Sequence, residues 1–359
     1  MTESIPKTMY AWRKHRGNSD PIWEEVPVPE VPPTGVLCKM IAAGGIHTHS
    51  SPLQLETGVA KKETDLDRAS NKWTLGHEGC GRIVKIGDRV EKSDFKIGDV
   101  VALFAVPGCG EAECPECSRD LAQLCERGHH SGIGQDGFFA PYATVDARGV
   151  VVIPEGVTPA EAAVATDAVT TAYHAITRRA EVKATEVVFL FGLGGLGFNA
   201  LQVARHVGAR VIVCDIKQVL LDEAVKLGVP REDVVPVGTS PQEFVRNRNG
   251  LHIDTVLDFV GTSQTFEDAQ HIVRRGGKLL CAGSMNPQNT IHMKIGTRKR
   301  LSFIFTYGGQ VRDVKEVLEL IARGVISPQV TEARLEDFPA RLAALVNGEV
   351  QGRTALMME

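Results

Sequence analysis

The sequence predicts an α/β protein of two domains, one a barrel-like antiparallel β domain and the other a doubly wound parallel sheet. Residues 1 to about 160 carry short apolar runs with frequent glycine and proline between them, which is typical of antiparallel strands. From residue 187 onward, apolar strands alternate strictly with amphipathic helices, which indicates a parallel sheet covered on both faces. The glycine-rich string FGLGGLG at 191–197 joins the first strand of this region to its first helix.

The composition is that of an ordinary globular chain and argues against several classes of protein. The 359 residues suffice for about two domains. Lys and Arg number 40 against 44 Asp and Glu, with no long run of like charge, so a nucleic-acid or membrane-surface partner has little support. The longest apolar run, at 100–107, is far shorter than the ~18 residues of a membrane span. The N-terminus lacks the charged start and apolar core of a signal peptide. We therefore expect a soluble, cytoplasmic protein.

The first region contributes the expected barrel strands and a long helix. Its strands are expected where apolar runs lie between turn residues, at 36–42, 82–86, 99–104, 142–145 and 150–153. Pro159 stands at the first turn of the helix, which continues to Ile176 along apolar residues at helical spacing.

The second region contributes the parallel sheet. Strands are expected at 187–191, 211–215, 255–258, 278–282 and 301–305, and helices at 196–207, 219–227 and 266–273. Beyond residue 307 we expect helices at 314–323 and 339–346 and a last strand at 353–357.

The string at 191–197 has the context that a dinucleotide-binding fingerprint requires, because it follows an apolar strand and opens a helix. Gly192 permits the tight turn, Gly194 lets backbone N–H groups approach a pyrophosphate, and Gly197 lets helix and strand pack closely. Asp215 ends the next strand, where a carboxylate binds the ribose hydroxyls of NAD and repels the 2′-phosphate of NADP. Lys217 weakens this preference a little. The motif predicts a Rossmann domain that binds NAD.

Further cofactor contacts are expected around the same turn and at the carboxyl ends of the other strands. In an open parallel sheet the ligand lies outside those ends, next to the point where strand order reverses. The candidates are Gly195, Leu196, Val260, Ser284 and Met285.

Four of the eight cysteines, Cys109, Cys114, Cys117 and Cys125, lie within 17 residues. In a reducing compartment such a cluster indicates metal ligation rather than a disulfide framework. Four thiolates suit a closed tetrahedral zinc site, which is structural because no coordination position remains for a substrate. The other four cysteines are scattered and are expected in the core.

The run GHEGCGRIVKIG at 76–87 completes a set of motifs that resembles the zinc-containing alcohol dehydrogenase family of medium-chain dehydrogenases/reductases. The pattern is met by Gly76, His77, Glu78, Gly81 and Gly87, followed by the cysteine lobe and the dinucleotide fingerprint. The resemblance implies a GroES-like β-barrel catalytic domain at 1–168, completed by 307–359, with a Rossmann domain at 169–306 inserted between them. The lobe at 109–125 departs slightly, with four residues rather than two between its first cysteines.

The resemblance implies a catalytic zinc ion, but the chain departs from the family at one ligand. Ile46 stands where the family has its first cysteine ligand, and Ile cannot bind metal. His77, Glu78 and Asp167 match the remaining ligand positions. In one interpretation zinc is retained, with His47 or His49 as the replacement ligand, and the protein is an alcohol dehydrogenase. Thr48 matches the hydroxyl that bonds the reacting oxygen and relays its proton.

In the second interpretation the catalytic zinc is absent, and the enzyme reduces a conjugated C=C or C=N bond by hydride delivery and general acid catalysis. His47, Thr48 or His49 would then supply the proton. A third possibility is a catalytically idle NAD(H)-binding structural or regulatory protein.

The resemblance adds two cofactor contacts and an oligomeric state. Thr171 matches a hydroxyl that lies against the nicotinamide, and Arg353 matches a C-terminal cofactor contact. The family implies a small-molecule substrate and a homodimer or homotetramer.

Overall fold

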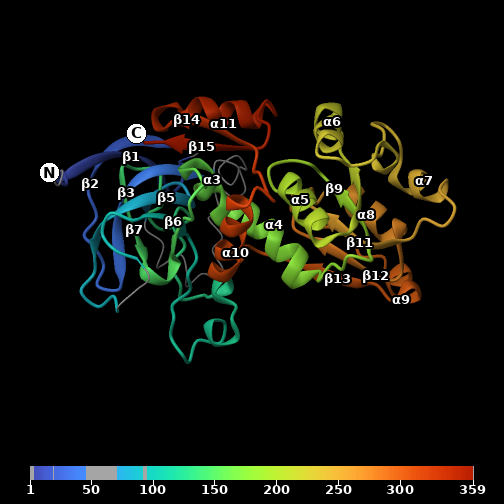
Figure 1. The fold of residues 1–359 in the computed structure, drawn as a ribbon, viewed down its shortest axis with the longest axis horizontal. Coiled ribbons are helices and arrows are strands. Elements are labelled where there is room, and N and C mark those ends of the chain that lie inside the picture. Colours follow the sequence, from blue (N-terminus) through green and yellow to red (C-terminus); the bar gives the residue numbers. More distant parts are fainter. Residues whose placement is uncertain (1–3, 19, 46–70, 92–94, 359) are drawn as a thin grey trace. The chain divides into compact units, whose positions relative to one another are not determined.

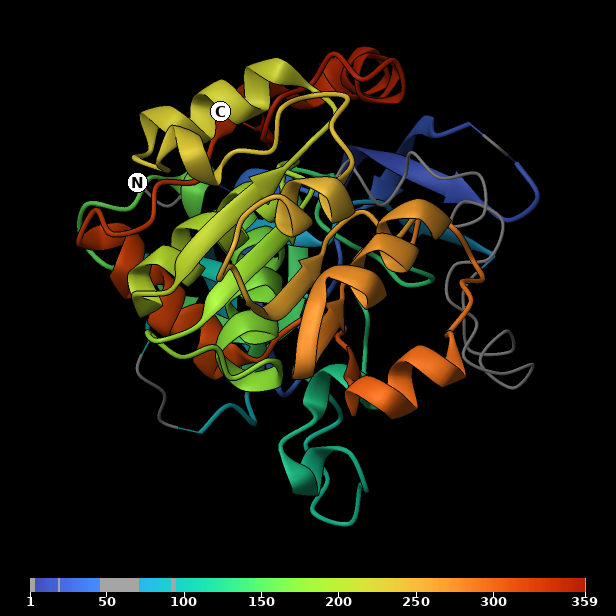
Figure 2. The same ribbon diagram turned by 90° about the vertical axis from the view of Figure 1, so that its right-hand side faces the viewer.

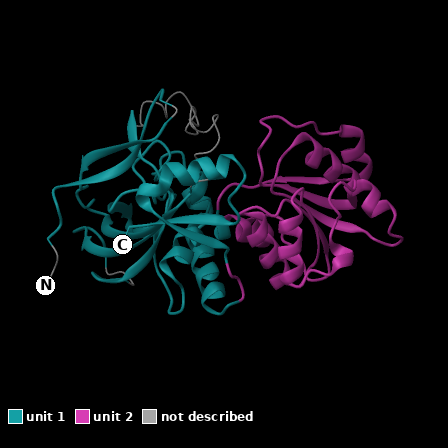
Figure 3. Ribbon diagram, turned by 90° about the horizontal axis from the view of Figure 1, so that it is seen from above, with its two compact units in different colours: residues 1–170, 309–324, 328–359 teal, residues 171–308, 325–327 magenta. Residues whose placement is uncertain are grey.

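The computed structural model describes residues 4–18, 20–45, 71–91 and 95–358. The chain divides into two compact units, which Figure 3 distinguishes by colour. Unit 1 comprises Met1–Thr170, Gly309–Gly324 and Pro328–Glu359, and unit 2 comprises Thr171–Gly308 and Val325–Ser327. The sequence placed the ends of the inserted domain at residues 169 and 306, and the structure places them at Thr171 and Gly308. The structure also assigns Val325–Ser327 to unit 2, which the sequence did not predict.

Unit 1 is built on two sheets, of seven and three strands among the described residues (Figure 1). The larger has the order β14-β15-β3-β5-β6-β8, with β7 also paired to β3, and the smaller has the order β2-β1-β4. Their bounds are β1 Thr8–His15, β2 Ile22–Pro27, β3 Gly35–Gly44, β4 Lys72–Thr74, β5 Glu78–Ile86, β6 Val100–Phe104, β7 Tyr142–Asp146, β8 Val150–Val152, β14 Val330–Arg334 and β15 Arg353–Met357.

The two ends of the chain meet in the core of unit 1. Trp12 of β1 packs edge-on against Phe338, the first residue of α11 (Phe338–Val346), with ring centroids 5.6 Å apart. Phe139 also packs edge-on against Phe338, with ring centroids 4.9 Å apart. The indole of Trp12 also donates a hydrogen bond to the carbonyl of Leu335. Burial of these rings joins the C-terminal segment to the N-terminal sheets.

One continuous helical stretch leads from the sheets of unit 1 to unit 2. It begins at α3 (Pro159–Val164), where Thr158 and Glu161 form a capping box. A π-helical turn (Ala165–Val169) follows, then α4 (Thr170–His174) and a second π-helical turn (Ala175–Arg179). The buried hydroxyl of Thr170 donates a hydrogen bond to the carbonyl of Ala165, the first residue of the first π turn. Such turns are frequent at functional sites.

Unit 2 is a parallel sheet with strand order β10-β9-β11-β12-β13 and helices against both faces (Figure 2). Its strands are β9 Val187–Phe191, β10 Arg210–Cys214, β11 Ile253–Asp258, β12 Val273–Cys281 and β13 Ser302–Phe305. Its helices are α5 Gly197–Val207, α6 Gln218–Lys226, α7 Pro241–Arg246, α8 Ser263–Ile272 and α9 Met293–Lys299. The chain leaves β9 toward β10 and returns to β11 on the other side of β9. The order therefore reverses beside β9, where doubly wound sheets bind their ligands.

The structure corrects several sequence expectations. The helix expected at 266–273 ends at Ile272, and Val273 already belongs to β12. The strand ending at Asp215 stops at Cys214. β1, β2, β4, β14, α7 and α9 were not expected, whereas α10 (Val311–Ala322) and α11 were. None of the helices in the described part of the chain has the length and apolar character that crossing a membrane requires.

Candidate functional site

The four cysteine sulfurs of the lobe lie where a tetrahedral zinc ion would place them. All four lie within 4.8 Å of one another, with Cys109 3.8 Å from Cys117 and Cys114 3.6 Å from Cys125. A tetrahedron with Zn–S bonds of ~2.3 Å has sulfurs about 3.8 Å apart. The lobe stands out from the rest of unit 1 (Figures 1 and 2) and has only two 3-10 turns of its own. The two extra residues between Cys109 and Cys114 do not prevent the four sulfurs from meeting.

A backbone hydrogen bond and a nearby guanidinium favour the thiolate at one of the lobe cysteines, Cys114. The backbone N–H of Cys117 and the guanidinium of Arg127 hold the pKa of Cys114 at about 7. Burial instead raises the pKa of Cys125 to about 12. Arg127 also pairs with Glu111. Cys114 thus has a pKa near neutral pH, whereas Cys125 resists ionisation. A bound dication would favour the thiolate form of all four cysteines.

A second donor cluster lies where the end of β3 meets the start of β5. Gly44 pairs opposite Glu78 in the sheet, and His77 directly precedes Glu78. Asp167 joins them from the first π turn, so that one nitrogen and two carboxylate oxygens lie within 4.8 Å of one another. His77 Nε2 is 3.5 Å from Asp167 Oδ2. Residues far apart in the sequence thus meet in one group.

Two glycines let the chain pass close to these ligands. A Cβ at Gly45 would lie 2.5 Å from the His77 ring, and the backbone there has φ +97°. A Cβ at Gly44 would lie 3.2 Å from the carboxyl carbon of Glu78 and closer still to one oxygen. Close approach therefore requires glycine at both positions, and backbone conformation requires it also at Gly45.

The electrostatics of the cluster are compatible with a bound cation. Burial raises the pKa of Glu78 to about 7, although Arg353 opposes this shift from 3.8 Å. Burial works to lower the pKa of His77, but the hydrogen bond and charge of Asp167 outweigh it and raise that pKa. Both oxygens of Glu78 are buried without a hydrogen-bond partner among the described residues. Carboxylate oxygens without hydrogen bonds, next to an imidazole, fit a divalent metal and leave a coordination position open.

Three candidates for this centre cannot be placed. His47, Thr48 and His49, with Ile46, lie outside the described residues. The structure therefore brings together His77, Glu78 and Asp167 of the candidate catalytic set.

In unit 2 the glycine-rich turn has the geometry that its motif predicts. Gly192 has φ +84°, and the space beyond Gly194 is open, with no atom within 4 Å of a Cβ built there. A Cβ at Gly197 would lie 2.8 Å from the carbonyl carbon of Gly192 and closer to its oxygen. Leu196 is the N-cap residue of α5, so the turn with Gly195 leads into a helix N-terminus, which favours phosphate.

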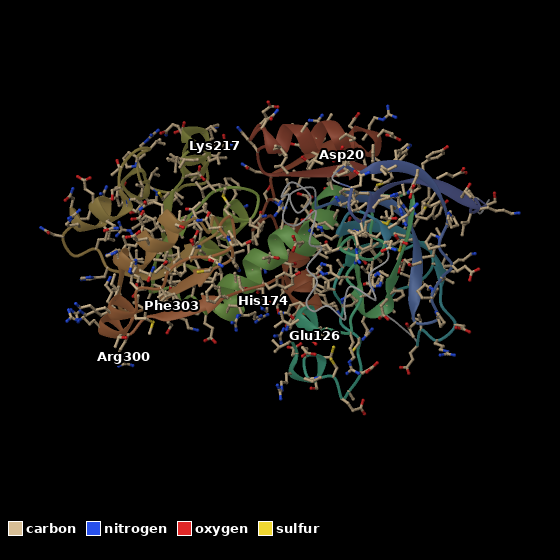
Figure 4. The ribbon with its side chains drawn as sticks, turned by 180° about the vertical axis from the view of Figure 1, so that it is seen from behind. Asp20, Glu126, His174, Lys217, Arg300 and Phe303 are labelled. Carbon is tan, nitrogen blue, oxygen red and sulfur yellow. The ribbon has the colours of Figure 1, made fainter. Side chains whose placement is uncertain are left out.

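Asp215 follows β10 beside this turn. Its two carboxylate oxygens accept backbone hydrogen bonds from Leu193, at 2.7 Å, and Lys217, at 2.8 Å. These bonds hold the carboxylate in one orientation next to the first glycine of the motif. Lys217 is exposed and lies at the start of α6 (Figure 4).

The loops after β11 and β12 lie beside the same turn. A Cβ at Gly192 would lie 2.6 Å from the Val260 side chain, and the N–H of Met285 bonds the Val260 carbonyl. Val260 and the exposed Ser284 and Met285 therefore share one sheet edge with the glycine turn. Thr171 is buried at the start of unit 2, whereas Arg353 lies in unit 1 against Glu78. The sequence did not anticipate that pairing.

Comparison with known proteins agrees with this arrangement. The family described as alcohol dehydrogenase GroES-like domain matches residues 32–155, and the family described as zinc-binding dehydrogenase matches residues 195–323. The chain belongs to the zinc-containing alcohol dehydrogenase family of medium-chain dehydrogenases/reductases. This medium-chain dehydrogenase is thus an NAD-dependent oxidoreductase with a GroES-like and a Rossmann domain, in a family that uses zinc.

Individual relatives extend over nearly the whole dehydrogenase. An NAD-dependent alcohol dehydrogenase of Sulfurisphaera tokodaii is 28% identical over 93% of this chain and 95% of its own. The acetophenone reductase of Geotrichum candidum, solved with NAD, has a TM-score of 0.87 at 28% identity and covers 99% of both chains. The alcohol dehydrogenase of Aeropyrum pernix has a TM-score of 0.84 at 28% identity, over 97% of this chain and 100% of that one.

Proposed function

We propose that this dehydrogenase interconverts an alcohol and a ketone or aldehyde by NAD-dependent hydride transfer, assisted by a metal held by His77, Glu78 and Asp167. The observation that carries the proposal is the cluster of these three donors in unit 1, where His77 and Glu78 are buried and Asp167 is partly exposed. Burying the carboxylate of Glu78 and the imidazole of His77 is costly unless they are paired, and a metal bound together with the partly exposed Asp167 would offset that cost.

Different residues of the chain bind the metal, bind the cofactor and orient the ligands. When bound, zinc polarises the substrate oxygen as a Lewis acid, and NAD accepts the hydride. Burial of His77 and Glu78 keeps water from the reacting oxygen, and Asp167 sets the orientation of the His77 ring. The glycine turn and the N-terminus of α5 bind the pyrophosphate, while Asp215 binds the ribose. The family resemblance assigns Thr48 the relay of the substrate hydroxyl proton toward solvent.

A zinc-independent reductase of conjugated C=C or C=N bonds is the second candidate. Ile46 replaces the expected thiolate ligand, and the side-chain pairs His77–Asp167 and Arg353–Glu78 can balance their own charge. These pairs would let the site persist without metal.

A substrate screen with matched variants separates the two candidates. Primary and secondary alcohols with NAD, and ketones, enones and imines with NADH, are followed by absorbance of the reduced cofactor. Asp167→Asn should lower kcat/KM for alcohols by at least about 100-fold, since it removes a charged ligand of the reacting centre. Asp20→Asn, at an exposed position of unit 1 (Figure 4), should leave the rate unchanged. If enones or imines are turned over and no alcohol is, the result would favour the second candidate. If no substrate is turned over, the result would favour the catalytically idle protein.

We also propose a homodimer or homotetramer in the cytoplasm. The support is β13, the last strand of the sheet of unit 2, where Phe305 is 62% exposed and Phe303 lies nearby (Figure 4). An apolar edge strand of this kind is covered by pairing with a second copy. Light scattering on the purified protein tests the assembly.

A further inference from the structure

We propose that the His77–Glu78–Asp167 centre is a thiolate-free site that accepts harder dications such as Mn²⁺ and Co²⁺ alongside Zn²⁺, while the cysteine lobe retains zinc. This inference rests on the metal assignment of the proposed function. It concerns which ions the centre takes, and predicts two classes of metal site in one chain.

No thiol of this chain belongs to the centre. All eight cysteines lie among the described residues, and four of them form the lobe. Cys38 and Cys80 are buried between β3 and β5, and Cys214 and Cys281 end β10 and β12 of unit 2. The donor atoms gathered within 4.8 Å at the centre are one nitrogen and two oxygens, with no sulfur among them.

The chemistry of that donor set affects which ions bind. Thiolate is the soft ligand that selects zinc, whereas carboxylate oxygens suit harder ions such as Mn²⁺ and Mg²⁺, and imidazole binds most of the first-row series. With Glu78 and Asp167 supplying two of three donors, the preference for zinc over manganese narrows. The lobe, with four sulfurs at tetrahedral separation, keeps that preference.

The charge of the centre also affects which ions bind. Glu78 is fully buried and His77 nearly so, and Arg353 is the fixed cation beside them, 3.8 Å from Glu78. With a neutral imidazole, the two carboxylates outnumber the one guanidinium, so the cluster is net negative and favours a cation bound through oxygen. Hard ions gain most from such a site, because their bonds to carboxylate are largely electrostatic.

Metal replacement on the full chain tests the proposal through spectra. Metal-free protein is titrated with Co²⁺ and, separately, with Mn²⁺ after the lobe has been refilled with one equivalent of Zn²⁺. We expect two Co²⁺ per chain, of which only the lobe ion produces a sulfur-to-cobalt charge-transfer band. We expect one Mn²⁺ per chain by electron paramagnetic resonance, displaced by added Zn²⁺.

Three variants locate the effects. Asp167→Cys supplies a thiolate at the centre, so its second Co²⁺ should gain a charge-transfer band. Asp167→Asn should weaken Mn²⁺ binding by about 10-fold or more. Cys117→Ser should remove the lobe band while the Mn²⁺ site persists. Circular dichroism and NADH binding verify that each variant is folded.

Each other outcome has one meaning. A charge-transfer band from the second Co²⁺ of the wild type would overturn the thiolate-free assignment. Binding of Zn²⁺ without Mn²⁺ would overturn the proposed selectivity but leave the zinc-assisted function standing. If the centre bound no cation at all, both this proposal and the metal-assisted alcohol dehydrogenase would fall, whatever substrate the enzyme turned over.

Discussion

The two glycines Gly194 and Gly197 of the nucleotide turn should respond to alanine in opposite ways. A Cβ at Gly197 would lie 2.8 Å from the carbonyl carbon of Gly192, so either the helix or the turn must move. A Cβ at Gly194 meets no atom within 4 Å. Neither glycine has a positive φ, so backbone strain does not enter the comparison. Gly197→Ala should therefore destabilise unit 2, whereas Gly194→Ala should spare its stability and weaken NAD binding.

The expected magnitudes follow from the contacts. Because these contacts with backbone are well under 3 Å, overpacking costs the upper part of its usual range, about 2–3 kcal/mol, and the gain in helix propensity returns at most about 1 kcal/mol. A net loss of about 1–2 kcal/mol lowers the Tm of a unit of this size by roughly 3–8 °C. At Gly194 the methyl group occupies the open space that the pyrophosphate needs. We expect its NADH dissociation constant to rise by about 10-fold, which is ~1.4 kcal/mol.

Calorimetry on the NAD-free protein and titration with NADH make the comparison. Tryptophan fluorescence would not serve for stability, because Trp12, Trp23 and Trp73 all belong to unit 1. An unchanged Tm in Gly197→Ala, or equal destabilisation by both variants, would refute the steric reasoning. Full NADH affinity in Gly194→Ala would show that the pyrophosphate lies elsewhere.

Three further predictions concern unit 1. Gly45→Ala places a methyl 2.5 Å from the His77 ring at φ +97°, so elemental analysis should find one metal per chain instead of two. Cys117→Ser should release the lobe zinc and lower the Tm by several degrees, with no change in NADH affinity. Burial works to raise the pKa of Asp146, but hydrogen bonds led by Arg148 outweigh it and depress that pKa. The stability from this carboxylate is therefore present above its unfolded pKa of about 3.9 and is lost as pH falls through the folded value. Urea unfolding at pH 3 and pH 7 should show a smaller acid loss in Asp146→Asn.

Sequence patterns predicted the parallel sheet better than the antiparallel domain. Strand β9 was expected with its observed bounds, because it is short, wholly apolar and followed by glycine. Strand β1 was missed because TMYAWRKH does not alternate in polarity, and Lys14 within it is 2% exposed. The pairing of β14 with β15 depends on contacts between distant segments, which local pattern does not contain.

The candidate metal centre could be found only partly from the sequence. The resemblance supplied His77, Glu78 and Asp167 as one ligand set, since their motifs are local. It did not supply the π turn that carries Asp167, because a one-residue widening of a helix leaves no mark in its periodicity. Nor did it supply the approach of Arg353 to Glu78, which follows from the return of β15 beside β3.

The pairing of Arg353 with Glu78 affects how well the fold tolerates loss of metal from the centre, compared with loss of metal from the lobe. Without a cation, Glu78 faces Arg353 and Asp167 faces His77, whose pKa is raised, so the centre can balance its own charge. A metal must compete with these pairs, which limits its affinity but leaves a tolerable site when it departs. The lobe has no comparable pairing among its own sulfurs and little core of its own. Loss of metal from the lobe should therefore unfold local structure, whereas loss from the centre should abolish chemistry and spare the fold.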